Sequence, residues 1–178
     1  MLNKIMYFSK DINGKLLKEY FFIKGKIEID SNYFIKKIKN SCNSKENWNY
    51  KTNVKGFMTS PFLFCHDLNF LKILKNFIKY IDSKYNLPHY HLKEAWGIQL
   101  NKGEKTEYHD HIDSLWSGVI YLNSSSQKLI FPEIKEEVKP EIGSFALFSN
   151  ILSHGCDVNN DNYPKFAISF NLYQTKNW

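Results

Sequence analysis

The feature that most constrains this chain is a row of alternating side chains, His109, His111 and Asp113, followed much later by a lone His154. Alternate residues of an extended segment point to the same side, so the three side chains of the row can face one space. His154 can join them only if the fold returns a second segment to the same place. The pattern therefore predicts a β-rich chain that builds a mononuclear metal site and leaves some coordination positions open.

Size and composition indicate one folded domain. The chain has 178 residues, of which 43% are hydrophobic and 16% aromatic, a content that supports a packed core and excludes a disordered chain. No apolar segment reaches the roughly 20 residues of a membrane-spanning helix, and the first residues lack the apolar stretch of a signal peptide. Cys42, Cys65 and Cys156 are odd in number and widely spaced, which favours reduced thiols. We therefore expect a cytoplasmic protein with no membrane partner.

The positive charge of the chain does not by itself indicate a nucleic-acid ligand. The formal net charge is +6, but all 24 basic residues are lysine and arginine is absent. Base recognition usually uses the bidentate geometry of arginine, which lysine lacks. The joint excess of lysine, asparagine, isoleucine, tyrosine and phenylalanine is typical of an AT-rich genome. We therefore do not expect nucleic acid as the direct ligand.

The first half of the chain is expected to supply edge strands and two helices. Residues 1–30 alternate apolar and lysine residues around the turn signal Asn13-Gly14, a pattern typical of paired strands. Asp30 can cap a short helix, and residues 40–56, rich in Asn, Ser and Lys, are expected to form an exposed loop. A longer helix is expected to begin after the N-cap Asp67. Its expected apolar face consists of Leu68, Leu71, Leu74, Ile78, Ile81 and Tyr85.

The second half changes to short runs of aromatic and β-branched residues separated by turn residues. We expect strands at Ala95–Leu100, Trp116–Leu122, Lys128–Phe131, Phe145–Phe148 and Phe166–Tyr173. Two helices followed by many short strands are typical of a helix-supported jelly roll. The sequence thus predicts one domain over residues 1–178, mainly β with N-terminal helices (α+β). Residues 1–90 would form a helix-containing buttress and residues 91–178 a jelly-roll, cupin-like core.

Four segments carry a resemblance to a known family. His109–Leu122 resembles the H-x-H…S-G-x-x-Y-(V/L) segment of 2-oxoglutarate/Fe(II)-dependent oxygenases common in marine bacteria and phages. Val138–Phe148, followed by Ser153-His154-Gly155, is similar to the P-x-x-G…F…H passage of the same superfamily. Lys165–Leu172 resembles its closing strand, and Tyr121-Leu122-Asn123 resembles the Y-L-N strand of prolyl hydroxylases.

The resemblance covers residues 94–173 and implies a double-stranded β-helix that binds Fe(II), 2-oxoglutarate and O₂. It implies a dioxygenase that hydroxylates a C–H bond and releases succinate and CO₂, in the host cytoplasm if the gene is carried by a phage. Lys165 stands where family members usually place an arginine that grips the C5 carboxylate of 2-oxoglutarate. A lysine would grip it with a point charge instead of a bidentate fork. Tyr121 is implied as a hydrogen-bond donor to the same carboxylate.

Two sets of metal ligands remain open. His109 and His111 match the H-x-H of the resembling family and give, with His154, a three-histidine site. His111 and Asp113 form a literal H-x-D, and a carboxylate would partly neutralise Fe(II) in a low-dielectric pocket. Because the spacing to Ser117-Gly118 fits the first set, we take His109, His111 and His154 as the expected ligands, with Asp113 as the alternative.

Other candidate residues are expected to pack rather than bind. His89-Tyr90-His91 is a second H-x-H, but it follows a helix exit and is expected at the surface. Trp96, Phe145 and Phe148 are expected in the core, and Trp116 at the mouth of the pocket.

The substrate is not specified by these patterns. A protein residue, suggested by Tyr121-Leu122-Asn123, and a small metabolite both fit, and residues 40–64 and 113–116 are expected to select it. Three other functions fit the same residues. A nucleic-acid demethylase of the same superfamily would need a basic, aromatic-lined face and would bind strands with a steep salt dependence. A three-histidine cupin dioxygenase that does not use 2-oxoglutarate would form no succinate and would not depend on Lys165. A non-enzymatic jelly-roll binding or virion protein would hold no metal tightly.

Overall fold

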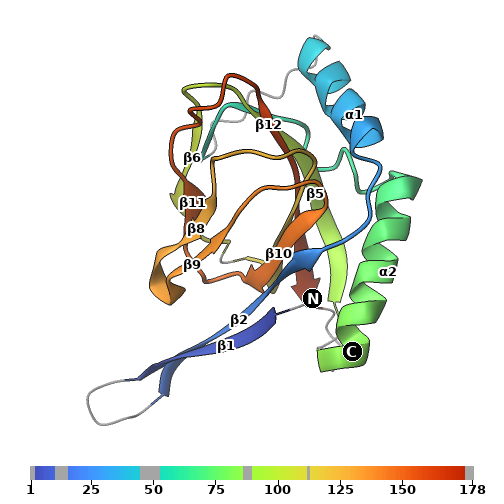
Figure 1. Ribbon diagram of the computed structural model, residues 1–178. Coiled ribbons are helices and arrows are strands. Elements are labelled where there is room, and N and C mark those ends of the chain that lie inside the picture. The colour runs from blue at the N-terminus through green and yellow to red at the C-terminus, as the bar shows by residue number, and fades with distance from the viewer. Residues whose placement is uncertain (1–2, 11–15, 45–52, 86–89, 112, 175–178) are drawn as a thin grey trace.

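The chain folds into two antiparallel sheets with two helices packed on one of them (Figure 1). The computed structural model describes residues 3–10, 16–44, 53–85, 90–111 and 113–174. The helices are α1 (Ser31–Asn43) and α2 (Leu68–Tyr85), with a 3₁₀ turn at Pro132–Ile134. The strands are β1 (Asn3–Lys10), β2 (Leu16–Lys26), β3 (Val54–Lys55), β4 (Phe57–Met58), β5 (Tyr90–Leu100), β6 (Lys105–His109), β7 (Trp116–Tyr121), β8 (Leu129–Phe131), β9 (Glu136–Val138), β10 (Ser144–Ser149), β11 (His154–Cys156) and β12 (Lys165–Gln174). None of the helices within those ranges is long and apolar enough to cross a membrane.

The larger sheet has the strand order β1-β2-β10-β7-β12-β5-β4, and the smaller sheet has the order β3-β6-β11-β8-β9. Neighbours in the larger sheet are far apart in sequence, as when β2 pairs with β10 and β12 pairs with both β5 and β7. Two facing sheets of this kind form a jelly roll, here the double-stranded β-helix that the sequence predicts. The first 90 residues contribute β1 and β2 to the larger sheet as well as both helices. The outer part of the β1–β2 hairpin extends beyond the rest of the molecule (Figure 1).

Strand β12 of the larger sheet is largely buried on both faces and shows how the side chains of a strand divide between them. Phe166, Ile168, Phe170 and Leu172 pack with the helices in one core cluster. Ala167 lies in a second cluster between the two sheets, and Lys165, Ser169 and Asn171 share its face and line a cavity there. Because successive residues of a strand point to opposite faces, one strand contributes to the helix-side core and to the interior between the sheets.

Both helix N-caps are confirmed. The Asp30 carboxylate accepts a hydrogen bond from the backbone N–H of Tyr33 at 3.1 Å, and that of Asp67 accepts one from Phe70 at 3.0 Å. The apolar face predicted for α2 is partly wrong, because Leu68 is 81% exposed. Leu74 and Ile81 are buried as predicted, and Phe70 and Phe77, which were not predicted, are buried with them. The phenyl rings of this row fill the space against the sheet, where Phe77 contacts Phe145 edge to face.

The loop expected at residues 40–56 is shorter at both ends than predicted. Helix α1 continues to Asn43 and β3 begins at Val54. Residues 45–52 lie outside the described residues, as does the Asn13-Gly14 turn. The five strands expected in the second half are all present, with bounds that differ by a few residues.

Candidate metal centre

Two histidines of the smaller sheet and one from the segment that follows β6 converge on one point. Strand β6 ends at His109, which pairs directly with His154 at the start of β11. His111 follows two residues later, where its backbone N–H donates to the Asn150 carbonyl at 2.9 Å. One ring nitrogen of each histidine lies within 4.8 Å of those of the other two, and within the described residues this is the one group of His, Cys, Asp and Glu side chains that could hold a metal ion.

Hydrogen bonds to the backbone fix how two of these rings present their nitrogens. His109 Nδ1 lies 2.8 Å from the Glu107 carbonyl, and His154 Nδ1 lies 3.0 Å from the Leu152 carbonyl. A carbonyl oxygen only accepts, so in the neutral ring Nδ1 carries the hydrogen and Nε2 keeps its lone pair. This is the usual arrangement of a metal-binding histidine, in which the second nitrogen orients the ring.

The three rings are held in their uncharged form. Burial lowers the pKa of His109, and burial together with the neighbouring His109 lowers the pKa of His111 to about 4. His154 is 6% exposed, and burial, followed by repulsion from the other two rings, lowers its pKa well below the ordinary value. Neutral imidazoles with free lone pairs are the form that binds a divalent transition metal. The donor set therefore fits a single metal ion held on one side.

Asp113 does not continue the row of the two histidines. The chain turns after His111, where the Ser114 backbone N–H donates to the His111 carbonyl at 3.0 Å. The Asp113 side chain is exposed and lies outside the three-histidine group. The alternation that held for His109 and His111 thus ends before Asp113.

The histidines line a cavity of about 430 Å³ between the two sheets. Its walls also include Trp96 and Phe148, so these two aromatics face the cavity as well as packing in the core. The Phe148 ring contacts the His154 ring at a centroid distance of 4.5 Å. Phe145 lies in the helix-side core as predicted. Trp116 does not rim the cavity: it is buried beside Phe21 and Tyr90 on the helix side, because the first residue of β7 points outward from the barrel.

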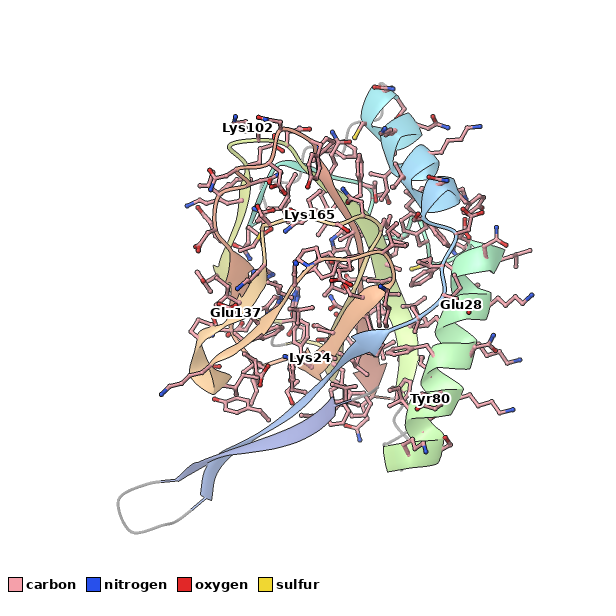
Figure 2. The ribbon with its side chains drawn as sticks, in the orientation of Figure 1. Lys24, Glu28, Tyr80, Lys102, Glu137 and Lys165 are labelled. Atoms are coloured by element: carbon pink, nitrogen blue, oxygen red, sulfur yellow. The ribbon has the colours of Figure 1, made fainter. Side chains whose placement is uncertain are left out.

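Lys165 lies in the same cavity as the histidines, and Figure 2 places it in the interior between the sheets. It is 4% exposed, and its Nζ lies 3.4 Å from the Gln127 carbonyl and 3.5 Å from Cys156 Sγ. Burial lowers the pKa of Lys165, while Cys156 and Asp161 act in the opposite direction. None of the salt bridges found among the described residues involves Lys165. A buried ammonium with no carboxylate partner favours the entry of an anion.

Tyr121 lies on the neighbouring strand, with its ring 5.8 Å from Lys165 Nζ. It is 2% exposed and lines the cavity, and burial raises its pKa well above the ordinary value. The phenol therefore stays protonated and able to donate a hydrogen bond. The two residues assigned to 2-oxoglutarate from the sequence thus lie side by side on one wall of the cavity.

Several cavity residues were not singled out from the sequence. Glu94, Cys156 and Phe62 line the cavity with the histidines, and so do Val54 and Met58 from the region expected to select substrate. Glu94 and Cys156 lie at inward-facing positions of β5 and β11. Neither belongs to a sequence motif that would indicate a cavity residue. Within the described residues, the second H-x-H adds no ligand to the candidate metal site. His91 is exposed beside Tyr173, and His89 lies outside the described residues.

Comparison with solved structures shows which known proteins share this fold. The chain superposes on viral collagen prolyl hydroxylase from Paramecium bursaria Chlorella virus-1, in its 2-oxoglutarate complex, with a TM-score of 0.66 at 17% identity over 88% of this chain and 96% of that one. A Pseudomonas putida prolyl-4-hydroxylase gives 0.65 at 12% identity over 87% and 93%. HygX from Streptomyces hygroscopicus, with nickel, 2-oxoglutarate and hygromycin B bound, gives 0.59 at 12% identity over 88% and 83%.

These similarities show that the chain has the double-stranded β-helix fold of 2-oxoglutarate-dependent oxygenases. No family model matches the sequence, and no curated protein matches it. The likeness is thus one of fold, and what this chain does has to be argued from its own cavity.

Proposed function

We propose that this protein is an Fe(II)- and 2-oxoglutarate-dependent dioxygenase that hydroxylates a C–H bond of a protein residue or a small metabolite. The observation that carries the proposal is the pairing, in one cavity, of three convergent neutral histidines with a buried lysine that forms no salt bridge within the described residues. The first set of groups suits a metal cation and the second an organic anion. A metal-chelating dicarboxylate such as 2-oxoglutarate satisfies both at once.

His109, His111 and His154 are the proposed ligands of the metal. Three histidines on one side leave the remaining positions for a bidentate cosubstrate and O₂. Bound there, Fe(II) and 2-oxoglutarate would together activate O₂, with 2-oxoglutarate converted to succinate and CO₂ as the substrate gains a hydroxyl group. Two of the similar structures contain 2-oxoglutarate, and one of them also holds nickel, which supports this assignment of cofactors.

Lys165 and Tyr121 are proposed to hold the far carboxylate of 2-oxoglutarate. The Lys165 ammonium supplies the opposite charge in a site from which water is largely excluded, and its interaction with a carboxylate is strong for that reason. The Tyr121 hydroxyl can donate to the same carboxylate. By holding one end of the cosubstrate, the pair orients its keto acid end toward the three histidines.

An anaerobic titration tests the proposal. Fe(II) is added to the purified protein, then 2-oxoglutarate, and the visible metal-to-ligand charge-transfer band is followed. We expect the band to appear with the wild type and to be absent with His154→Ala. We also expect His154→Ala to abolish 2-oxoglutarate turnover, and a variant that keeps full activity would contradict the ligand assignment.

Two other outcomes point to other functions. Binding of Fe(II) without the band, and turnover without succinate, would favour a three-histidine cupin dioxygenase that does not use 2-oxoglutarate. Failure to bind any divalent transition metal would leave a non-enzymatic jelly-roll binding protein.

A further inference from the structure

The cavity has a carboxylate at the end opposite Lys165. Strands β5 and β12 run side by side along one wall, with Lys165 opposite Leu100 and Asn171 opposite Glu94. Asn171 lies six residues after Lys165 along the strand, which places their Cα atoms about 20 Å apart. His111 lies between these ends, since its ring is 6.4 Å from that of Trp96, which is opposite Ser169 on the same pair of strands.

Glu94 is held in place by a chain of buried polar groups. The Asn171 amide nitrogen donates to Glu94 Oε2 at 2.9 Å, and the Ser117 hydroxyl donates to the Asn171 amide oxygen at 2.9 Å. Asn171 is 4% exposed and Ser117 is 2% exposed. Burying such groups in the interior of a barrel is costly unless each has a partner. Here the partners fix the orientation of the Glu94 carboxylate.

Within the described parts of the chain, no lysine forms a salt bridge with the Glu94 carboxylate, although the chain carries 24 basic residues. The group that donates to its carboxylate is the neutral Asn171 amide. As far as the described residues extend, the cavity thus contains an ammonium without a carboxylate at one end and a carboxylate without a cation at the other.

The wall beside Glu94 is aromatic and carries an unused donor. The Trp96 side chain lines the cavity two residues along the same face of β5, is 9% exposed, and its indole N–H has no hydrogen-bond partner among the described residues. Phe62 also lines the cavity and is exposed, and its segment is fixed against β5 by the hydrogen bond from the Ala95 N–H to the Pro61 carbonyl. Aromatic faces attract organic cations.

One further carboxylate, that of the exposed Asp113, lies near this end, as does the Lys93 ammonium, whose Nζ is 4.3 Å from the centre of the Tyr173 ring. Burial raises the pKa of Tyr173, and the charges of Glu94 and Asp113 raise it further, so both carboxylates act on the same end of β12. A cation that reaches this end of the cavity therefore meets the Glu94 carboxylate, with the Asp113 carboxylate near the same end of β12.

We propose that the substrate of this cavity carries a positively charged amine or guanidinium group, which pairs with Glu94 and places a neighbouring C–H bond at the metal centre. The inference rests on the proposed function, which assigns the Lys165 end to 2-oxoglutarate and leaves the Glu94 end for the substrate. The opposite charges of the two ends keep the two molecules from exchanging places.

Binding of matched cationic and neutral probes tests the inference. Protein loaded anaerobically with Fe(II) and 2-oxoglutarate is titrated by calorimetry with lysine and arginine, and with their neutral counterparts norleucine and citrulline. The same four side chains are then offered within short peptides, which tells a free amino acid from a protein residue. We expect at least one cationic probe to bind about tenfold or more tightly than its neutral counterpart, the usual size of a charge-assisted contact.

Glu94→Gln keeps the shape and the hydrogen bond from Asn171 but removes the charge. We expect it to reduce the preference for the cationic probe to less than about threefold while leaving the binding of Fe(II) and 2-oxoglutarate unchanged. The control Glu28→Gln removes an equal charge from an exposed position beside α2, on the other side of the larger sheet from Lys165 (Figure 2), and should change nothing.

Equal binding of cationic and neutral probes by the wild type, binding of none of them, or an unchanged preference in Glu94→Gln would overturn the inference. Each of these results is distinct from failure of the proposed function, which would appear earlier as failure to load Fe(II) and 2-oxoglutarate.

Discussion

Lys165 is the residue whose environment most restricts what can enter the cavity. An ammonium beside a thiol and a carbonyl has lost most of its hydration and gained little in return. A carboxylate that docked against it would recover that cost, and the proposed role of the side chain as an anion site follows from this. This role depends on the charge and the length of the Lys165 side chain. A substitution of Lys165 can remove them without altering the three histidines.

We expect Lys165→Met to raise the 2-oxoglutarate concentration needed for half-maximal turnover by about tenfold or more, because a hydrogen bond to a charged group is lost. A keto acid that lacks the C5 carboxylate should be affected far less, since it never contacts Lys165. The readout is succinate or CO₂ release as a function of keto acid concentration. Lys102→Met, at an exposed lysine, is the control. Equal losses for both keto acids would show that Lys165 acts through the fold instead.

Gly143 is a second position where one residue type is required. Its φ of 76° lies in the left-handed region, and a Cβ atom there would come within 2.0 Å of the Ile27 carbonyl oxygen. That carbonyl belongs to the segment joining β2 to α1, and the Ile27 N–H donates back to the Gly143 carbonyl at 2.9 Å. The turn before β10 is therefore held against the N-terminal segment by close backbone contact, in addition to the ion pair between Lys26 and Glu141.

Gly143→Ala should lower the free energy of unfolding by about 2 kcal/mol or more, through both backbone strain and collision. Gly103→Ala separates the two causes. Gly103 also has a positive φ, 86°, but a methyl group at its Cα would meet none of the described atoms within 4 Å beyond its chain neighbours. Gly103→Ala should lower the free energy of unfolding by only about 1 kcal/mol. Urea denaturation of both variants measures the difference, and similar losses would mean that the contact with Ile27 relaxes at little cost.

At the scale of elements, the two helices are joined by one polar cluster. The Asp67 carboxylate caps α2, pairs with Lys37 of α1, and accepts a hydrogen bond from the Tyr33 hydroxyl at 2.8 Å. Burial acts to raise the pKa of Asp67, but the hydrogen bonds from Lys37, the Phe70 N–H and Tyr33 together outweigh it, and the pKa lies below the ordinary 3.8. The charged form of Asp67 therefore stabilises the folded chain.

We expect Asp67→Asn to lower the free energy of unfolding at pH 7 by about 1–3 kcal/mol, while Asp67→Ala costs more because the cap is lost as well. Since the folded pKa is below the unfolded one, the charge contributes its full stability above the unfolded pKa. That contribution disappears as the pH falls through the folded pKa. The difference between wild type and Asp67→Asn should thus vanish in acid, as measured by denaturation at a series of pH values. A difference that does not depend on pH would contradict this account.

The sequence predicted the elements whose own residues determine them and missed those made by distant pairing. Strands such as β7 and β12 are runs rich in aromatic and β-branched residues, which predict strands from the sequence. Asp30 and Asp67 predict the starts of the two helices, because aspartate is a common N-cap residue. The strand β11 is three residues long, and nothing in His154-Gly155-Cys156 suggests a strand; it exists because β6 and β8 lie on either side of it. The grouping of His109, His111 and His154 was still predictable, because histidine is a common metal ligand and its positions can be read from the sequence. Glu94 was not, since its role depends on the register between β5 and β12.

At the scale of the whole molecule, the cavity divides its contacts between the two sheets. The histidines come from β6, β11 and the segment after β6, whereas Lys165 and Tyr121 come from β12 and β7 of the larger sheet. A metal bound as proposed would contact only the histidines. A metal with 2-oxoglutarate would contact both sheets and connect them across the interior.

The thermal stability of the protein should therefore rise in two steps. Anaerobic Fe(II) should raise Tm, and 2-oxoglutarate should raise it again, each by an amount equivalent to about 2.7 kcal/mol when present at about 100 times its Kd. We expect His154→Ala to lose both steps and Lys165→Met to lose mainly the second. Differential scanning calorimetry measures the shifts. A second step that survives intact in Lys165→Met would place the cosubstrate elsewhere.

Both faces of strand β12 are occupied by side chains with a structural role. One row of its side chains holds Lys165 and Asn171 at the two ends of the cavity, and the other row, with Phe166 and Phe170, fills the core beneath the helices. Inserting or deleting a single residue would exchange the rows, turning phenyl rings toward the metal centre and an ammonium toward the helices. Side chains along β12 can therefore change one at a time, but its length cannot. Changes in length among proteins descended from this one should be confined to the connections on either side of it.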